Sequence, residues 1–275
     1  MMRLTNSLAI LRRFSLCLAL TLGFFQVVNF AATESKIAAQ KNQKSALWQQ
    51  KTDDEVQSIG RRFITPGKYL VYGLNRNNMS AILDRAPLEF TAEAARVKPV
   101  ILEIPAPDGT MMRFRIEDSP ILSPEVAAGF PGWKTFQGYG VDDPTATARF
   151  DFTPSGFHAY ILSSGGTFAI DPFQENDRGN YIVYNKSDLT KDSSIHCSLD
   201  EELKGDGESA IEDAPSFSNG AQIRTYRLAV ATTFEYTTLF GGATQAFNQV
   251  VTSVNRVSGV YRKELAVSFT LVSTT

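Results

Sequence analysis

The last part of the chain contains a strand, a long helix and a second strand in immediate succession. Residues 224–232 alternate between polar and apolar side chains and then become apolar, which is typical of a strand buried on at least one face. After Gly241 and Gly242, apolar residues recur at spacings of three and four, which predicts an amphipathic helix of about five turns. These positions are Phe247, Val250, Val251, Val254, Val257 and Tyr261. Residues 265–272 predict the second strand.

This pattern constrains the fold, because a strand–helix–strand connection makes its two strands parallel neighbours in one sheet. A two-stranded parallel sheet needs further strands beside it and cover on both faces. We therefore expect residues 221–275 to be the incomplete start of a larger α/β domain. The alternative is that the unit packs on the preceding region as one composite domain.

Composition excludes several classes of protein. A hydrophobic content of 43% and a charged content of 20% are ordinary for a globular chain, and 275 residues allow one or two domains. A formal net charge of -2 provides no general attraction to nucleic acid or to an anionic membrane. We therefore expect no nucleic-acid partner.

Residues 1–32 are typical of an export signal. Arginines precede a largely apolar stretch at 14–30, and the two alanines at 31–32 are small residues suited to cleavage. Gln26 and Asn29 argue against a stable membrane span. We predict a secreted, extracellular protein, and an uncleaved membrane anchor is the alternative.

The middle of the chain divides by composition into three parts. Residues 33–62 are mostly polar and predict a loose or helical lead-in. Residues 63–186 contain short alternating runs between closely spaced turn signals, which predicts an antiparallel meander or sandwich. Within them, Ser119–Gly140 is rich in Pro and Gly and predicts a long connection. Residues 187–220 are acidic and Gly-rich and predict an exposed linker that proteases cut easily.

Strands are predicted at 68–74, 100–104, 111–116, 146–152, 156–162, 167–170 and 181–184, with a hairpin turn at Pro107–Gly109. The sequence as a whole therefore predicts an α+β fold, in which an antiparallel β-rich domain is followed by an incomplete β-α-β unit.

Several motifs resemble a known family. The motif FPGWKTFQGYGVDDP at 130–144, the motif ARFDFTPSGFHA at 148–159 and the tripeptide IDP at 170–172 resemble the propeptide region of bacterial secreted reprolysin-like zinc metallopeptidases. The motifs RTYRLAVA at 224–231 and VNRVSGVY at 254–261 resemble the first strand and first helix of their catalytic domain.

The resemblance implies a zymogen fragment. It implies a signal peptide at 1–32, a lead-in at 33–62, a β-rich propeptide domain at 63–186 that assists folding and latency, an activation linker at 187–220, and the truncated start of a metzincin-type catalytic domain at 221–275. The implied partners are the remainder of the catalytic domain and, after maturation, protein or peptide substrates.

Members of that family bind zinc through three histidines of an HExxHxxGxxH helix, whose glutamate is the general base. The two histidines of this sequence, His158 and His196, do not begin such a motif. The resemblance therefore implies zinc for the full-length protein. We expect the residues present to bind no zinc and to be inactive in peptide hydrolysis on their own.

Cys197 is the candidate for metal chemistry. Once the signal is removed, it is the one cysteine of an exported chain. A thiolate is a strong zinc ligand, and the resemblance implies that Cys197 could act as a latency ligand that displaces the catalytic water. A disulfide to the missing part of the protein and a thiol without a special role are the alternatives.

Other polar residues favour structural roles. His158 alternates with aromatic neighbours on a predicted strand, which indicates a hydrogen-bonded structural histidine. His196 could orient the thiol of Cys197 or be a solvated loop residue, and Asp142 and Asp143 precede a proline, as turn-capping residues do. Two functional alternatives to the peptidase are a secreted non-catalytic β-sandwich module for binding, adhesion or inhibition, and a truncated inactive gene product.

Overall fold

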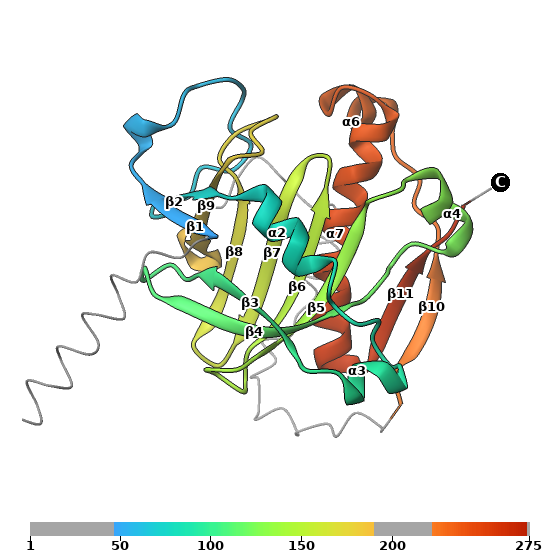
Figure 1. The fold of residues 1–275 in the computed structure, drawn as a ribbon. Helices are drawn as coiled ribbons and strands as arrows, with labels where there is room; N and C mark the ends of the chain where they lie inside the picture. Colours follow the sequence, from blue (N-terminus) through green and yellow to red (C-terminus); the bar gives the residue numbers. More distant parts are fainter. Residues whose placement is uncertain (1–46, 190–221, 274–275) are drawn as a thin grey trace, which may run out of the picture. The chain divides into compact units, whose positions relative to one another are not determined.

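A long antiparallel sheet dominates the computed structural model, which describes residues 47–189 and 222–273 (Figure 1). Its strands are β1 (Trp48–Lys51), β2 (Leu70–Leu74), β3 (Val100–Pro105), β4 (Met111–Asp118), β5 (Lys134–Gly140), β6 (Thr147–Thr153), β7 (Gly156–Ser163), β8 (Gly166–Pro172) and β9 (Asn180–Asn185). The nine strands lie in the order β1-β2-β9-β8-β7-β6-β5-β4-β3. From β3 to β9 each strand pairs with its successor in the chain, so the predicted antiparallel meander is confirmed.

The sheet curls until its two edge strands meet. The indole Nε1 of Trp48, on β1, donates a hydrogen bond of 2.9 Å to the backbone oxygen of Glu103, on β3. These strands are the two ends of the sheet order, so the hydrogen bond joins the edges. Because strands that twist can close around a core, the curled sheet encloses its own apolar side chains.

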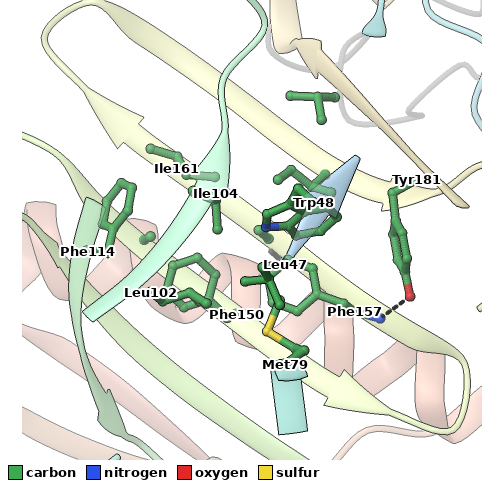
Figure 2. Close-up of a cluster of buried hydrophobic side chains, with 14 of the residues drawn as sticks. Leu47, Trp48, Met79, Leu102, Ile104, Phe114, Phe150, Phe157, Ile161 and Tyr181 are labelled. Atoms are coloured by element: carbon green, nitrogen blue, oxygen red, sulfur yellow. Dashed lines mark hydrogen bonds between the residues drawn. The ribbon is translucent and has the colours of Figure 1, made fainter. Parts of the chain in front are cut away.

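Aromatic rings and aliphatic side chains together fill the interior of the curled sheet, as Figure 2 shows. Trp48 packs edge-on against Phe157 and Tyr181, with ring centroids 5.7 Å apart in each pair. The rings of Phe150 and Phe157 are stacked, with their centroids 5.9 Å apart. The Tyr181 hydroxyl accepts a hydrogen bond from the backbone N–H of Phe157, which satisfies a buried polar group inside the core.

Short helices connect the strands. They are η1 (Asp53–Glu55), α2 (Arg76–Leu83), α3 (Ala92–Arg96), α4 (Pro124–Gly129) and η2 (Lys186–Asp188). Asn75 caps α2 by accepting from the backbone N–H of Asn78. Helix α2 adds Met79 and Leu83 to the same core, so it covers the inner face of the sheet.

The C-terminal part forms the predicted strand–helix–strand unit. Its elements are β10 (Arg224–Leu228), α6 (Phe234–Leu239), α7 (Ala243–Leu265) and β11 (Val267–Leu271). Strands β10 and β11 are parallel, with Tyr226 opposite Phe269. Gly242 precedes α7 at φ 133°, and Ala266 ends the helix in the left-handed region. The expected parallel pair and crossover helix are confirmed.

Two expectations from the sequence are wrong. Strand β5 lies within Ser119–Gly140, which the sequence predicts to be a connection. Its glycines obscure the alternation of the strand, in which Phe136 points inward and Thr135 and Gln137 point outward. Strand β1 lies inside the expected lead-in, where the polar run is held in the sheet by pairing with β2 and by the buried Trp48.

Several predicted features lie outside the described residues. These are the signal at 1–32, His196, Cys197 and almost all of the linker at 187–220. Within 47–189 and 222–273, no helix is both long enough and apolar enough to cross a membrane.

Trp48 should therefore be a main support of the curled sheet. We expect Trp48→Ala to lower the free energy of unfolding by about 3–5 kcal/mol, because it removes a fully buried aromatic side chain and the hydrogen bond between the sheet edges. Urea denaturation measures the change. Gln49→Ala, at the exposed neighbouring position, should change the same quantity by less than about 0.5 kcal/mol. Equal effects of the two substitutions would contradict the role assigned to Trp48.

Candidate functional site

Helix α7 is buried on two different faces. One face is apolar and packs on β11 and on the segment before β5. Its cluster contains Ile121, Leu122, Val250, Val251 and Leu271, with Trp133, Leu228, Tyr236, Phe247 and Val254 around them. The second buried face carries Asn248, Thr252, Asn255 and Gly259. These polar and small residues face β6, β7 and the turn between them. Ser258 is also buried, but its hydroxyl accepts from the backbone N–H of Phe269 on β11.

The sheet meets this helix with charged side chains, because alternation along β6 places opposite chemistry on its two faces. Phe150 points into the aromatic core, and its neighbours Arg149 and Asp151 point outward. On β7, Phe157 points inward and His158 outward. Arg149 and Asp151 are 2% and 1% exposed, so helix α7 covers charged groups that the sheet alone would leave in water.

Arg149 forms the centre of the contact. Its Nε donates to Oδ1 of Asn255 at 2.9 Å, and its Nη1 donates to the side chains of Ser119 and Gln137. Its Nη2 donates to the backbone oxygen of Ser119. Asn255 in turn donates to the backbone oxygen of Phe150. Burial, with the nearby positive charge of Arg262, lowers the pKa of Arg149 to about 9, so the group stays charged at neutral pH.

Asp151, His158 and Thr252 form a second buried group. The Asp151 carboxylate accepts from the Thr252 hydroxyl at 3.0 Å and lies 2.7 Å from Nδ1 of His158. The predicted structural histidine is therefore confirmed. A nucleophilic triad needs the hydroxyl and the carboxylate on opposite ring nitrogens, but here both lie beside Nδ1. The arrangement consequently supports docking and not acyl transfer.

An ion pair joins the helix to β8. Arg256 donates to Asp171, whose other oxygen accepts from the hydroxyl of Tyr184 at 2.7 Å. Burial by itself raises the pKa of Asp171, but the charge of Arg256 and the Tyr184 hydrogen bond outweigh it and hold that pKa below its ordinary value. Burial and the Asp171 charge raise the pKa of Tyr184.

A further ion pair holds the C-terminal half of α7. Arg262 donates to both carboxylate oxygens of Glu89 and also to the hydroxyl of Ser119. Ser119 thereby contacts Arg149 and Arg262 together. Phe90, beside Glu89, has φ 60°, and the guanidinium of Arg262 lies over its ring.

Strand pairing adds a last contact between the segment after β4 and the C-terminal β-α-β unit. Leu122 forms a parallel bridge with Leu271 of β11. The backbone N–H of Ser123 donates to the oxygen of Leu271, and the N–H of Leu271 donates to the oxygen of Ile121. The segment at 121–123 therefore covers the edge of β11. The opposite edge of the pair, on β10, has no partner strand among the described residues, and Arg224–Arg227 are exposed.

Metal ligands are not gathered at this site. Within 47–189 and 222–273, no three His, Cys, Asp or Glu side chains are placed to hold a metal ion. His158, on β7, already contacts the carboxylate of Asp151, on β6. Asp142 and Asp143 are turn residues, as expected: Asp143 accepts from the N–H of Thr145, and Asp142 pairs with Arg113 at the surface.

Comparison with known proteins concerns the C-terminal unit. Residues 222–275 match the family model described as metallo-peptidase family M12B, reprolysin-like. The match supports the similarity of this unit to the reprolysin-like metallopeptidases. The matched residues contain β10, α7 and β11, whereas the curled sheet lies before them. No curated protein matches the chain.

Sequence reasoning found the apolar face of α7 and missed the polar one. Asn248, Thr252, Asn255 and Gly259 are spaced by four, three and four residues, which is a helical stripe. A stripe of uncharged polar and small residues beside an apolar one was the available signal, but polarity alone suggests exposure to water.

Gly259 should be required for the approach of Arg149. A Cβ at residue 259 would lie 2.6 Å from Cγ of Arg149, which is buried and cannot move aside. We expect Gly259→Ala to destabilise the protein by about 1–3 kcal/mol through overpacking, although the same change in an exposed helix stabilises by up to about 1 kcal/mol. Urea denaturation measures it, with Ser253→Ala on the exposed face as the matched control. Stabilisation by Gly259→Ala would contradict this packing.

The ion pair of Asp171 predicts acid sensitivity. The pKa of Asp171 is lower in the folded state than in the unfolded state. The ion pair therefore contributes fully to the free energy of unfolding above the ordinary carboxyl pKa of about 3.9, and this contribution is lost as pH falls through the lower folded-state pKa. The free energy of unfolding of the wild type should exceed that of Asp171→Asn by a constant amount between about pH 5 and 7, and the difference should shrink below about pH 4. Asp54→Asn, at an exposed position, is the charge control. A difference independent of pH would contradict the assignment.

Proposed function

We propose that the chain is the N-terminal part of a secreted zinc metalloendopeptidase zymogen. The observation that carries the proposal is the agreement of two features in the same residues. Residues 222–275 match a reprolysin-like peptidase family, and they fold as a parallel β-α-β unit whose β10 edge and exposed side chains leave room for further strands. Such a unit requires more sheet to be covered on both faces.

In this proposal the propeptide domain is the curled sheet, which includes β1 at Trp48–Lys51 as well as the strands within 63–186. It holds α7 through Arg149, Asp151 and Asp171 and covers the edge of β11. Polar contacts of this kind stabilise a bound arrangement, and each surface remains compatible with water when the two parts separate. These are the properties that a folding assistant needs if it is removed after the linker at 187–220 is cut.

The zinc ligands of the complete enzyme would be residues that are not in this sequence. Peptidases of this family use zinc, but the side chains described here do not fit a zinc centre: they contain no cluster of three ligands, and His158 is bound to Asp151. We therefore assign no catalytic step to this chain. The proposed substrates are proteins or peptides, cleaved by the complete enzyme.

The proposal is tested by the coding DNA after codon 275 and by the protein it encodes. We expect an HExxHxxGxxH motif downstream, and about one zinc per chain in the purified full-length protein by metal analysis. A form ending at Thr275 should retain no zinc above a chelator-treated control. A stop codon directly after Thr275 would instead favour a non-catalytic binding, adhesion or inhibitor module, or an inactive gene product.

Cys197 remains a proposed latency ligand, because it lies outside the described residues. If its thiolate occupies the zinc position needed by the catalytic water, Cys197→Ser in the full-length precursor should raise peptidase activity before processing by at least about tenfold. Hydrolysis of a fluorogenic casein substrate measures this, and Ser198→Ala is the matched control. An unchanged silent precursor would exclude the switch and leave the disulfide or the ordinary thiol.

A further inference from the structure

The two ion pairs between the curled sheet and α7 have their charges sorted by side. Both carboxylates belong to the preceding region, with Asp171 on β8 and Glu89 between α2 and α3. Both cations, Arg256 and Arg262, belong to α7. Acid can remove the charge of a carboxylate but leaves a guanidinium charged. Protonation would therefore take the negative charges from one side of the contact and leave the positive charges on the other.

The two arginines have few other acceptors. Among residues 47–189 and 222–273, Asp171 is the one hydrogen-bond acceptor of Arg256, and the Nε of Arg256 is buried without a partner. Arg262 donates to Glu89 and otherwise to the hydroxyl of Ser119, and its side chain is 8% exposed. A buried guanidinium that loses its counter-charge is strongly destabilising. Separation of α7 from the sheet relieves this by returning both arginines to water.

The groups around Asp171 keep its charge at neutral pH. The hydroxyl of Tyr184, on β9, donates to it, and His158, on β7, lies near it. Burial raises the pKa of Asp171, but the charge of Arg256 and these neighbours hold it below its ordinary value. A positive charge on His158 favours the ionised carboxylate, so it opposes separation and does not cause it.

Glu89 has charged neighbours on three other elements. Arg149 on β6 attracts it, whereas Asp118 at the end of β4 and Tyr139 on β5 lie near enough to interact with it. The one carboxylate at the contact without a cationic partner on α7 is Asp151, which binds His158 and the hydroxyl of Thr252. The pH response of the contact therefore depends mainly on the two ion pairs.

The core inside the curled sheet lies on the other face of these strands. Along β8, Ile170 belongs to the inner core, and its neighbour Asp171 faces α7. The inner core consists of apolar and aromatic side chains, and the hydrogen bond that joins the sheet edges runs from the indole of Trp48 to a backbone oxygen. None of these groups titrates in mild acid. Acid should consequently weaken the contact with α7 before it weakens the sheet.

We propose that the contact between α7 and the curled sheet is an acid-sensitive switch: when Asp171 and Glu89 are protonated, the C-terminal unit detaches while the curled sheet stays folded. Docking should be constant above the ordinary carboxyl pKa of about 3.9. Below it, docking should weaken by up to about tenfold per pH unit for each carboxylate that binds a proton on detachment. The switch would hold a propeptide near neutral pH after the linker is cut and release it in acid. That use rests on the proposed function, whereas the detachment itself does not.

The two tryptophans of the chain report detachment and unfolding separately. Trp133 packs on Phe247 of α7, with ring centroids 5.7 Å apart, and Trp48 lies in the core of the curled sheet. We expect an acid titration of the 275-residue chain, followed by NMR of the indole N–H groups, to change the Trp133 signal below about pH 4 while the Trp48 signal persists. Trp133→Phe assigns the signals. Changes of both signals at the same pH, or no change of Trp133 before Trp48 is lost, would overturn the proposal.

A variant that imitates the protonated carboxylates tests the cause. Asp171→Asn combined with Glu89→Gln keeps the shapes and removes both charges, so docking should weaken by about tenfold or more for each ion pair. The Trp133 transition should therefore begin at a higher pH than in the wild type, and the Trp48 transition should stay in place. Asp54→Asn, at an exposed position, is the control and should move neither transition.

The Trp48 signal also shows whether the sheet of the double variant is folded. A Trp133 transition at the wild-type pH in a folded double variant excludes the two ion pairs as the switch. Loss of the Trp48 signal from the double variant at neutral pH contradicts the proposal as well, because it makes these charges part of the stability of the sheet. The peptidase assignment is decided separately, by the sequence after codon 275.

Discussion

The buried guanidinium of Arg149 is the contact on which the arrangement depends. A charged group with 2% of its surface exposed must be surrounded by hydrogen-bond partners, because an unpaired buried charge costs several kcal/mol. Its partners come from the loop before α4, from β5 and from α7. The sheet and the helix therefore supply hydrogen-bond partners to each other, and without the helix Arg149 would lose part of its set of partners.

Helix α7 contacts the preceding region through both of its buried faces. Val250 and Val251 pack in an apolar cluster with Leu271 of β11 and with Ile121 and Leu122 of the segment after β4. The opposite stripe makes polar contacts to the sheet, and their stability depends on every partner being present. An apolar contact at that place would be difficult to separate in water. A polar one is suited to a domain that assists folding and is later released, which is the role we propose.

Much of the fold was predictable because its signals are local. Alternation identified β6, β7, β8 and β9, and the spacing of Val250, Val254 and Val257 identified α7. Strand β1 was not predictable, because it is short and polar and is held by pairing and by one tryptophan. Strand β5 was concealed by its glycines. The site was largely missed: His158 was recognised as structural, but its partners Asp151 and Thr252 are distant in sequence from each other.

The sequence by itself determined the class of the fold, the parallel crossover unit and the absence of an HExxH motif from these residues, because periodicity and composition can be read along one strand or helix. Only the tertiary structure decided that the sheet curls onto Trp48, that its charged outer face is buried, and that Asn255 and Gly259 receive Arg149. The physical reason is that burial of a polar side chain depends on hydrogen-bond partners from distant segments of the chain. A local sequence pattern does not identify those partners.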